Sequence, residues 1–367
     1  MRYFIKLTSI TLIIWLATAS IVSAASGKEI TIVTFNTWFG LDGVGTIKMG
    51  EYEDKKMAEK RYQILLKELK RLDPDIIGLQ EANKLPKYAK RIARDLGYDE
   101  IHQINNSGIK IGPLGIPYNM KMGLIILAKK PYHLKRVGAF QISGDKHGIY
   151  KDWFTFHLSE SWFVLSGKIE VDGKPIYLFN THLHAGLPEN PGYFQELKLL
   201  KDEGKITPKE YQEYLESYNG DIQRFISETK KTLCFVSKIT PSDAPAILMG
   251  DFNATENSDA IKIIVKDGNF LDTYRIANPT DRGFTWCSEN PHTHFDAAPT
   301  YARGNQKNPY DLIKARYDLV SRRIDYIFIN SYFQKDNILD SSIILNKPVQ
   351  GLYPSDHYGV LSRITFH

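Results

Sequence analysis

The chain has 367 residues, of which 43% are hydrophobic and 24% are charged, so it can bury the core of one large domain or two small ones. Its formal charge of +5 is compatible with an anionic substrate or a membrane surface, but it is too small to indicate tight, general binding of nucleic acid. With only two cysteines, Cys234 and Cys287, a disulfide scaffold and a cysteine-rich zinc site are excluded. The sequence leaves open whether the two cysteines pair.

The N-terminus has the features of a secretory signal. Arg2 and Lys6 precede an apolar run over 7–22, and Val22-Ser23-Ala24 supplies the small residues of a cleavage site. A membrane anchor is the alternative, but the run is short for a span and contains five serine and threonine residues. We therefore predict cleavage of residues 1–24, a secreted or periplasmic protein, and a single domain over 25–367. Cleavage removes two basic groups and no acidic one, which lowers the formal charge to +3.

In the first part of the mature chain, strands and helices are predicted to alternate, as they do in layered α/β proteins. β-Branched and apolar runs predict the strands, and apolar residues that recur at steps of three and four predict the helices. The elements in order are a strand over 29–38, a helix over 58–72, a strand over 76–80, a helix over 85–96 and a strand over 123–128. The first strand leaves the core at Asn36, and the second ends at Glu81.

The middle of the chain begins with its most aromatic stretch, residues 150–163, which we interpret as core packing rather than as a membrane-inserting element. Strands are expected over 162–171 and 174–180, joined by the two-residue turn Asp172-Gly173. The second of these strands leads directly into His182.

Residues 188–240 are predicted to be mostly helical. A charged, tyrosine-rich piece at about 188–220 is interpreted as a helical insertion on the surface, followed by a second helix over 222–239. A long loop is expected at about 276–320, and loops of this length are uncommon unless they are functional or disordered. The last strands are predicted at 323–329, 342–345 and 358–366.

The segment 246–253 is an apolar strand that ends in Gly-Asp-Phe-Asn. Residues i and i+2 of an extended segment project to the same side, so Asp251 and Asn253 are expected to lie together. A carboxylate beside an amide suits an oxygen-liganded cation and a phosphate. Taken alone, the same residues also fit a polar turn.

Polar residues of catalytic type therefore stand at several strand ends. Four strands leave the core at such residues, and two later strands begin at them. If the later strands run antiparallel to the earlier ones, all of these positions meet at one edge of the sheets. They are Asn36, Glu81, His182, Asp251 with Asn253, Asp325, and Asp356 with His357.

Six motifs at these positions resemble, in order, those of the endonuclease/exonuclease/phosphatase superfamily of metal-dependent phosphoesterases. They are Thr-Phe-Asn-Thr-Trp (34–38), Ile-Gly-Leu-Gln-Glu (77–81), Asn-Thr-His-Leu-His-Ala (180–185), Met-Gly-Asp-Phe-Asn (249–253), Arg-Ile-Asp-Tyr-Ile-Phe (323–328) and Ser-Asp-His (355–357). Within the superfamily the chain looks most similar to the neutral sphingomyelinases. This finer similarity rests on less specific features, which are Thr-His-Leu-His-Ala, the segment 109–127, the entry to the long loop at 271–274, and Ser-Asp-His.

The resemblance implies an α/β (α+β) fold in four layers, with a two-sheet β-sandwich flanked by helices. It implies Mg²⁺, with Mn²⁺ as the alternative ion, held by Glu81 as the principal ligand and by Asn36, with a contact from Asp356. His357 would take a proton from the attacking water, and Asp325 would hold its imidazole ring. Asp251 and Asn253 would orient the water and contact the phosphate, while His182 would donate to a phosphate oxygen or to the leaving group.

Each of these residues also has a structural interpretation. A lone histidine or aspartate at a strand end is most often a turn residue, and Asp325 could simply pair with Arg322 or Arg323. His182 and His184, joined by Asp251 and His357, could instead hold zinc, although Glu81 and Asn36 favour magnesium. His292 and His294 have no motif support and are interpreted as loop residues.

The expected function is a secreted, Mg²⁺-dependent phospholipase C-type phosphodiesterase that releases phosphocholine from sphingomyelin or a related phospholipid at a membrane surface. A secreted nuclease on the same fold is the first alternative, since fold does not fix substrate. A phosphoinositide phosphatase is disfavoured by the secretory signal, and a binding module without catalysis by the competent residue types at all six motifs. No obligate protein partner is inferred. An exposed aromatic hairpin before the final Asp-His, present in some secreted bacterial sphingomyelinases, is not evident between Phe328 and Ser355.

Overall fold

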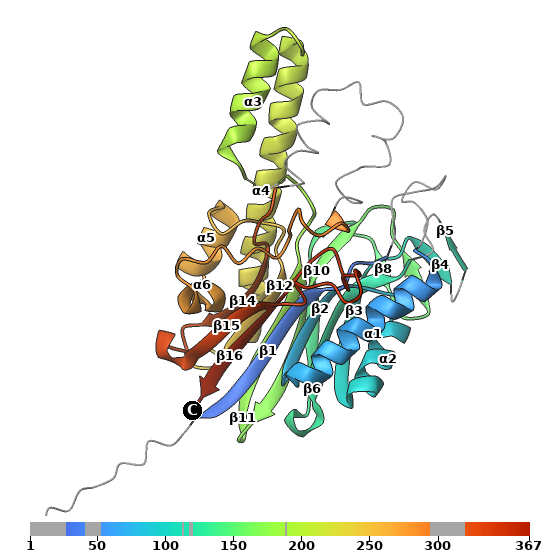
Figure 1. Cartoon of the computed structure of the whole chain (residues 1–367), viewed down its shortest axis with the longest axis vertical. Helices are drawn as coiled ribbons and strands as arrows, with labels where there is room; N and C mark the ends of the chain where they lie inside the picture. Colours follow the sequence, from blue (N-terminus) through green and yellow to red (C-terminus); the bar gives the residue numbers. More distant parts are fainter. Residues whose placement is uncertain (1–26, 41–52, 112–113, 117–119, 188, 294–319) are drawn as a thin grey trace, which may run out of the picture.

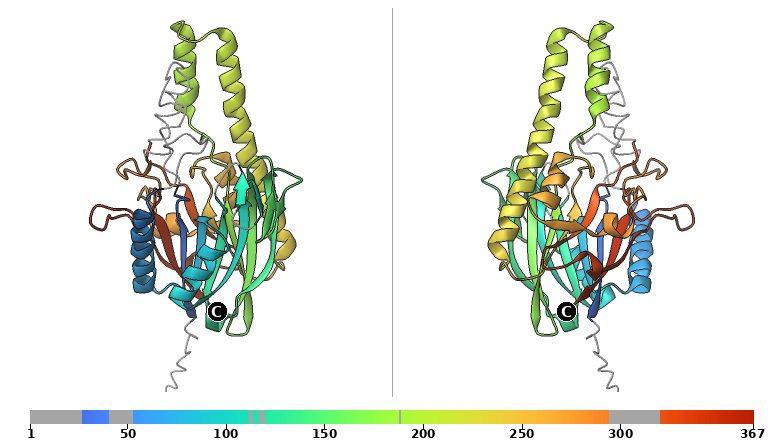
Figure 2. Two further views of the ribbon diagram at one scale, coloured as in Figure 1. Left: turned by 90° about the vertical axis from the view of Figure 1, so that its right-hand side faces the viewer. Right: turned by 90° about the vertical axis from the view of Figure 1, so that its left-hand side faces the viewer.

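The computed structural model describes residues 27–40, 53–111, 114–116, 120–187, 189–293 and 320–367. Within these ranges, two mixed six-stranded sheets pack face to face, and helices cover both outer faces (Figures 1 and 2). The predicted two-sheet sandwich flanked by helices is therefore confirmed. The predicted signal over 1–24 lies outside the described residues, as do His294 and most of the predicted long loop.

The first sheet has the strand order β15-β16-β1-β2-β6-β3. β1 pairs parallel with β2 and antiparallel with β16, so the ends of β1 and β2 and the start of β16 meet at one edge. The strands are β1 (Lys28–Asn36), β2 (Ile76–Asn83), β3 (Tyr98–Asn106), β6 (Met122–Lys129), β15 (Ile338–Ile344) and β16 (Gly359–Phe366).

The second sheet has the order β13-β14-β12-β11-β10-β7. β11 pairs parallel with β12, and β12 pairs antiparallel with β14, which brings the ends of β11 and β12 to the start of β14. The strands are β7 (Lys135–Gly144), β10 (Ser161–Val171), β11 (Lys174–His182), β12 (Ala246–Asp251), β13 (Phe270–Asp272) and β14 (Asp325–Asn330). The expected antiparallel arrangement of the late strands is confirmed in both sheets.

Helices α1 (Lys55–Leu72) and α2 (Lys87–Leu96) cover the first sheet, and α4 (Pro208–Ile239) and α5 (Asp259–Lys266) cover the second (Figure 2). Helix α3 (Pro191–Asp202) forms a hairpin with the first part of α4 that projects from the sandwich (Figure 1). The predicted separation between the insertion and a second helix at 222 is wrong, because α4 runs through this point without a break. A short helix α6 (Thr273–Ala277) and two 3-10 turns, Lys130–Tyr132 and Lys335–Asn337, complete the helical elements of the described ranges.

Three apolar layers hold the sandwich together. One lies between the sheets, one between the first sheet and α1 and α2, and one between the second sheet and α4 and α5. Each fully buried leucine or isoleucine contributes roughly 1.5–3 kcal/mol by leaving water. None of the helices in the described ranges combines the length and the apolar character needed to cross a bilayer.

Helix α1 shows how the local sequence fixes the elements beside the polar strand ends. Asp54 caps its first turn by accepting the N–H groups of Lys56 and Met57. Leu65 and Leu69 lie one turn apart and are buried against the first sheet. The helix ends where Asp73 adopts a left-handed conformation before Pro74.

A buried pair of amides joins the two sheets below the polar strand ends. Gln80 of β2 donates to Asn180 Oδ1 of β11 over 2.7 Å. The Asn180 Nδ2 group in turn donates to the carbonyl oxygens of Leu79, at 2.9 Å, and Ile125, at 2.8 Å. Both amide side chains are completely buried, so these bonds fix how the sheets are aligned at this edge.

The aromatic stretch 150–163 is divided between core and surface. Phe163 is buried, but Trp153 is 69% exposed, so the prediction of core packing is wrong for this tryptophan. The stretch contributes to a small four-stranded sheet of β4 (Ile109–Ile111), β5 (Leu114–Ile116), β8 (Ile149–Tyr150) and β9 (Phe154–Phe156). Trp153 lies in the bend between β8 and β9 rather than on a strand, so its side chain has no sheet to pack against. The two cysteines are both free.

We predict that Asn180→Ala lowers the free energy of unfolding by about 3 kcal/mol, because it removes the acceptor of one of the two Gln80 Nε2 hydrogen bonds and the side-chain donor to two buried backbone carbonyls. Urea unfolding measures this value. The control is Gln63→Ala, which removes a single exposed hydrogen bond to Glu59 and should change stability by less than about 0.5 kcal/mol. Equal effects of the two substitutions would contradict a bridging role for Asn180.

Candidate active site

The eight residues singled out from the sequence meet at one edge of the sandwich, called here the polar edge. In the second sheet, His182 of β11 lies opposite Asp251 of β12, and Asp251 lies opposite Asp325 of β14. Between the sheets, Asn36 Nδ2 donates to Asp251 Oδ2 over 3.0 Å. The edge is formed by Asn36, Glu81, His182, Asp251, Asn253, Asp325, Asp356 and His357.

Glu81 reaches the polar edge through a distortion of β2. The pairing of β2 with β6 shifts between Leu79 and Ala82, and Glu81 has a φ of 55°, a strained value for a residue with a side chain. The Phe39 N–H donates to Glu81 Oε2 over 3.1 Å, and Glu81 Oε1 lies 3.8 Å from His182 Nε2. Burial, together with the neighbouring Asp356 carboxylate, raises the pKa of Glu81 to about 8.

Gly250 sets the position of Asp251. Its φ is +147°, and a Cβ atom there would lie 2.0 Å from the carbonyl oxygen of Thr181. Only glycine therefore allows β12 to approach β11 this closely at the position before Asp251. Asp251 Oδ1 accepts the N–H of Asn253, which turns the chain back and leaves Oδ2 to face Asn36, His182 and His357.

His357 and Asp325 form a buried pair. His357 Nδ1 lies 2.9 Å from Asp325 Oδ2, and its Nε2 atom lies 3.7 Å from Asp251 Oδ2. Burial opposes the charged imidazolium, but the carboxylates of Asp325 and Asp251 raise the pKa of His357 well above its ordinary value. The Trp286 ring meets the imidazole edge to face at 5.0 Å, and the backbone N–H of Asp325 donates to Thr285 Oγ1 over 3.1 Å.

His182 lies beside Asn253 on the other side of Asp251. Asn253 Nδ2 lies 3.1 Å from His182 Nε2 and also donates to the carbonyl oxygen of Leu183. Burial lowers the pKa of His182, so its neutral form is favoured, and in this arrangement Nε2 accepts from the amide. The donor role expected for His182 therefore requires a protonated ring.

His184 does not join the polar edge, which removes it from the alternative zinc set. Its backbone N–H and its Nδ1 atom lie 3.0 and 3.2 Å from Glu228 Oε2, a completely buried carboxylate of helix α4. His292 is a loop residue as predicted, but its ring lies 5.2 Å from that of Trp38, close behind Asn36.

The polar edge is suited to a divalent cation. Four buried or largely buried carboxylates, those of Glu81, Asp251, Asp325 and Asp356, face the imidazoles of His182 and His357. Among the described residues, Asp325 Oδ1 is a buried oxygen with no hydrogen-bond partner. Oxygen-rich, acidic sites of this kind fit Mg²⁺ or Mn²⁺.

Two groups of atoms at the edge could hold such an ion. Asp251, Asp325 and His357 offer ligand atoms that all lie within 4.8 Å of one another, but His357 Nδ1 is already bonded to Asp325 there. Glu81 and Asp356 form the other group, in which burial and then the Asp356 carboxylate raise the pKa of Glu81, while His357 and Asn36 lower it. We favour Glu81 and Asp356, because binding there leaves the imidazole–carboxylate pair intact. The Asn36 side chain bonds to Glu81, while its Oδ1 atom accepts the N–H of Trp38 at 3.0 Å.

Two supporting residues were not found from the sequence. Buried Arg61 of α1 donates to the carbonyl oxygens of Thr37, at 3.2 Å, and Pro354, at 2.6 Å, and so connects the segments that carry Asn36 and Asp356. The sequence feature that could have indicated this role is the position of Arg61 one turn before Leu65, on the inward face of the helix. Asn290 donates to the carbonyl oxygens of Ser355 and Asp356 from within the predicted long loop, where no pattern marks it.

Comparisons with known proteins bear on the fold and on the family. Residues 228–357 match the model of the Endonuclease/Exonuclease/phosphatase family. A search of curated proteins with the sequence finds no significant match. Solved structures with the same fold include a mannosyl-6-phosphatase from Bacteroides thetaiotaomicron VPI-5482 (16% identity over 92% of this chain and 100% of that one, TM-score 0.53). A second is an endonuclease/exonuclease/phosphatase family protein from Leptotrichia buccalis C-1013-b (17% identity over 92% of this chain and 100% of that one, TM-score 0.53). A third is truncated TDP2 from Caenorhabditis elegans (13% identity over 92% of this chain and 97% of that one, TM-score 0.52).

At these identities the structural matches show the fold, which is that of the endonuclease/exonuclease/phosphatase superfamily. The family model matches residues 228–357, about a third of the chain, and the members of this superfamily are metal-dependent phosphoester hydrolases. The finer resemblance to neutral sphingomyelinases is not shown by these matches and stays a prediction.

We predict that Glu81→Gln raises the melting temperature of the metal-free protein at pH 8 and abolishes the further increase on adding Mg²⁺. The sign follows from the raised pKa of Glu81, since a carboxyl that is harder to ionise in the folded state destabilises the fold once the pH exceeds its unfolded value. Each kcal/mol corresponds to roughly 2–4 °C. Glu68→Gln, a surface change, serves as the control. An unchanged Mg²⁺ response in Glu81→Gln would count against this residue as a ligand.

Proposed function

We propose, from this family relationship and the geometry of the polar edge, that the chain is a metal-dependent phosphodiester hydrolase in which His357 activates the attacking water. The observation that carries the proposal is the buried His357–Asp325 pair, with 2.9 Å between Nδ1 and Oδ2. The carboxylate fixes the ring so that Nε2 faces Asp251, which is the arrangement of a general base with its orienting group.

The other residues take roles that follow from their positions. Asp251 Oδ2 faces the same space as His357 Nε2, so it accepts a hydrogen bond from the attacking water. His357 takes the water proton as the new P–O bond forms and the bond to the leaving oxygen breaks. Asn253 contacts a phosphate oxygen, and protonated His182 beside it donates to the phosphate or to the leaving oxygen.

Glu81 and Asp356 would hold the ion, with Asn36 beside them. When bound, Mg²⁺ or Mn²⁺ would neutralise the phosphate charge and reduce the excess negative charge that keeps His357 protonated. Arg61 bonds to the backbone of Thr37 and Pro354, next to Asn36 and Asp356. Asn290 bonds to the backbone of Ser355 and Asp356. These two residues therefore hold in place the segments that carry the proposed ligands.

We further propose that the substrate is sphingomyelin or a related phospholipid, cut to release phosphocholine by a secreted or periplasmic enzyme. Exposed apolar side chains on and beside the small sheet support this substrate class. Trp153 is 69%, Leu158 79% and Ile111 62% exposed. The small sheet lies at the end of the sandwich to which β1 and β2 lead (Figure 1), so these side chains could enter a lipid surface while the polar edge faces it. No obligate protein partner is proposed.

A secreted nuclease is the second candidate. The observation in its favour is a cationic pocket that adjoins the segment after Asn36, since positive charge beside the site suits a substrate with many phosphates. The purified protein should therefore be assayed with Mg²⁺ and with chelator, on sphingomyelin vesicles and on supercoiled plasmid. We expect Mg²⁺-dependent release of phosphocholine. Plasmid nicking without phosphocholine release would instead show that the substrate is nucleic acid and not a phospholipid.

We predict that His357→Ala lowers kcat for bis(4-nitrophenyl) phosphate by about 10³-fold or more, because the attacking water loses its base. Asp325→Asn should lower kcat by about 10²-fold or more, since it weakens the orientation of the ring and the stabilisation of its charge. Circular dichroism checks that both variants fold. His147→Ala, at an exposed position, should have no effect. A His357→Ala variant with near-normal kcat would exclude His357 as the base.

A further inference from the structure

A buried carboxylate on helix α4, that of Glu228, lies outside the polar edge and takes no part in the roles proposed above. Its side chain is completely buried. Burial alone would raise the pKa of Glu228, but hydrogen bonds from His184 and Ser143 lower it below its ordinary value. The carboxylate is therefore ionised at neutral pH. A buried charge is tolerated only where its partners compensate it, so the contacts of Glu228 show what it holds in place.

One oxygen of Glu228 holds the chain just after the end of β11. Glu228 Oε2 accepts the backbone N–H of His184 at 3.0 Å, and His184 Nδ1 lies 3.2 Å from the same oxygen. β11 ends at His182, and its pairing with β12 ends there as well. Helix α4 therefore holds the chain at the point where the sheet no longer does.

The other oxygen of Glu228 fixes the carboxylate itself. Arg224, one turn earlier in α4, donates its Nε–H to Glu228 Oε1 over 3.0 Å. The hydroxyl group of Ser143, in the last turn of chain of β7, also donates to Oε1. The Arg224 guanidinium group lies 4.1 Å from the ring centre of Trp162 in β10. The position of the carboxylate is therefore set by β7 and β10 as well as by its own helix.

The segment held in this way, residues 182–184, makes two contacts with the polar edge. The N–H of Leu183 donates to the carbonyl oxygen of Asp251 over 3.0 Å. The carbonyl oxygen of Leu183 accepts Asn253 Nδ2 at 3.1 Å, and the same amide nitrogen lies 3.1 Å from His182 Nε2. A displacement of this segment would therefore move both the Asn253 amide and the His182 ring.

The His184 ring is enclosed and does not face the polar edge. Its centre lies 4.0 Å from that of the Phe225 ring, and its Nε2 atom lies 3.8 Å from Asp221 Oδ1. The His184 side chain is almost completely buried among these groups, so it does not contact a substrate. Its contact with Glu228 connects α4 to the segment 182–184.

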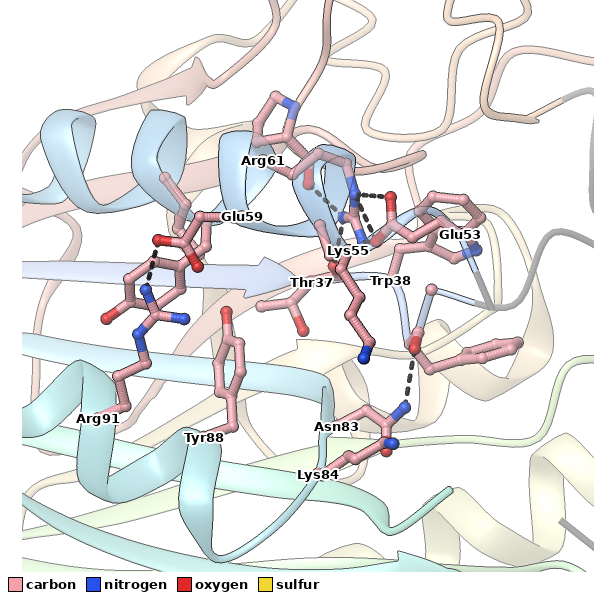
Figure 3. Close-up of a pocket in the computed structure, with 16 residues that line it drawn as sticks. Thr37, Trp38, Glu53, Lys55, Glu59, Arg61, Asn83, Lys84, Tyr88 and Arg91 are labelled. Atoms are coloured by element: carbon pink, nitrogen blue, oxygen red, sulfur yellow. Dashed lines mark hydrogen bonds and ion pairs between the residues drawn. The ribbon is translucent and has the colours of Figure 1, made fainter. Parts of the chain in front are cut away.

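The first sheet has a corresponding contact from its own helix layer. Arg61 of α1 donates to the carbonyl oxygens of Thr37, at 3.2 Å, and Pro354, at 2.6 Å (Figure 3). Each helix layer thus sends one charged side chain to the backbone of a segment that carries the polar edge. Arg61 holds the side of the proposed metal ligands, and Glu228 holds the side of the groups proposed to contact the phosphate.

We propose that Glu228 is a positioning residue for the hydrolysis, which holds the backbone at His184 and thereby keeps the Asn253 amide and the His182 ring in their working positions. The proposal rests on the phosphodiesterase function and adds to it a residue of a helix that does not itself reach the polar edge. A purely structural role would change the stability of the fold without acting through Asn253 or His182.

The test is a double-mutant cycle that measures kcat for bis(4-nitrophenyl) phosphate with Mg²⁺. Glu228→Met removes the accepting oxygens but fills a similar space, and we expect it to lower kcat by about 30-fold, because the groups that contact the phosphate shift. The same change in an Asn253→Ala or a His182→Ala background should lower kcat by about fivefold or less, since part of what Glu228 positions is already absent.

Two further variants control for the loss of structure. Glu228→Gln keeps an oxygen that can accept the backbone N–H of His184, so it should recover most of the kcat that Glu228→Met loses. Thr232→Val is the matched control, because the buried hydroxyl group of Thr232 donates to the carbonyl oxygen of Glu228 over 2.9 Å, one turn further along α4. This variant removes a buried hydrogen bond of the same helix without touching His184, and its kcat should stay within about twofold. Circular dichroism checks that each variant folds.

Equal losses of kcat from Glu228→Met in all three backgrounds would overturn the proposal while leaving the phosphodiesterase function in place. Equal losses in Glu228→Met and Thr232→Val would overturn it as well, because the effect would then be one of general stability. If Glu228→Met does not fold, Glu228→Asp takes its place in the cycle, since the shorter side chain cannot span both sets of partners. Absence of turnover in the unaltered protein would instead contradict the proposed function, and this proposal with it.

A crystal structure of Glu228→Met provides the second measurement, which does not depend on activity. We expect the hydrogen bond between Asn253 Nδ2 and the carbonyl oxygen of Leu183 to be broken and the His182 ring to be displaced. Unmoved Asn253 and His182 side chains in this variant would overturn the proposal, whatever the turnover.

Discussion

Buried hydrogen bonds made by amide side chains join the two sheets and hold the polar edge together. Gln80 and Asn180 bridge the sheets within the core, and Asn36 and Asp251 bridge them at the edge itself. The Asn180 amide is bonded to Gln80 and to the carbonyl oxygens of Leu79 and Ile125, whereas Gln80 Oε1 is buried without a hydrogen-bond partner among the described residues. Residues more than 200 positions apart in the chain are thereby fixed to within hydrogen-bonding distance.

The same edge concentrates negative charge in a buried place, which is unfavourable without a cation. The raised pKa values of Glu81 and Asp251 and the unpartnered oxygen of Asp325 are three signs of this strain. The site therefore sacrifices stability in the metal-free state for the ability to bind a divalent ion.

Strand patterns and polar residues at strand ends are local signals, and they predicted which residues form the polar edge. The two-sheet fold was predicted from the resemblance of the six motifs to a known superfamily. The antiparallel direction of the late strands was a condition of this prediction, and the structure meets it. Arg61 could not be found this way, since its role depends on Pro354, 293 residues away. Trp153 was misplaced because hydrophobicity alone does not show that it falls in the bend between two short strands. The continuous helix α4 was missed because the polar residues around 220 resemble those of a helix end.

The most direct test of the account is anomalous diffraction from crystals grown with Mn²⁺, which locates the ion without reference to any activity. Our account predicts a peak between the carboxylates of Glu81 and Asp356, with the His357–Asp325 pair still intact. A peak between Asp251, Asp325 and His357 would contradict it, because the imidazole would then serve as a ligand and could not act as the base.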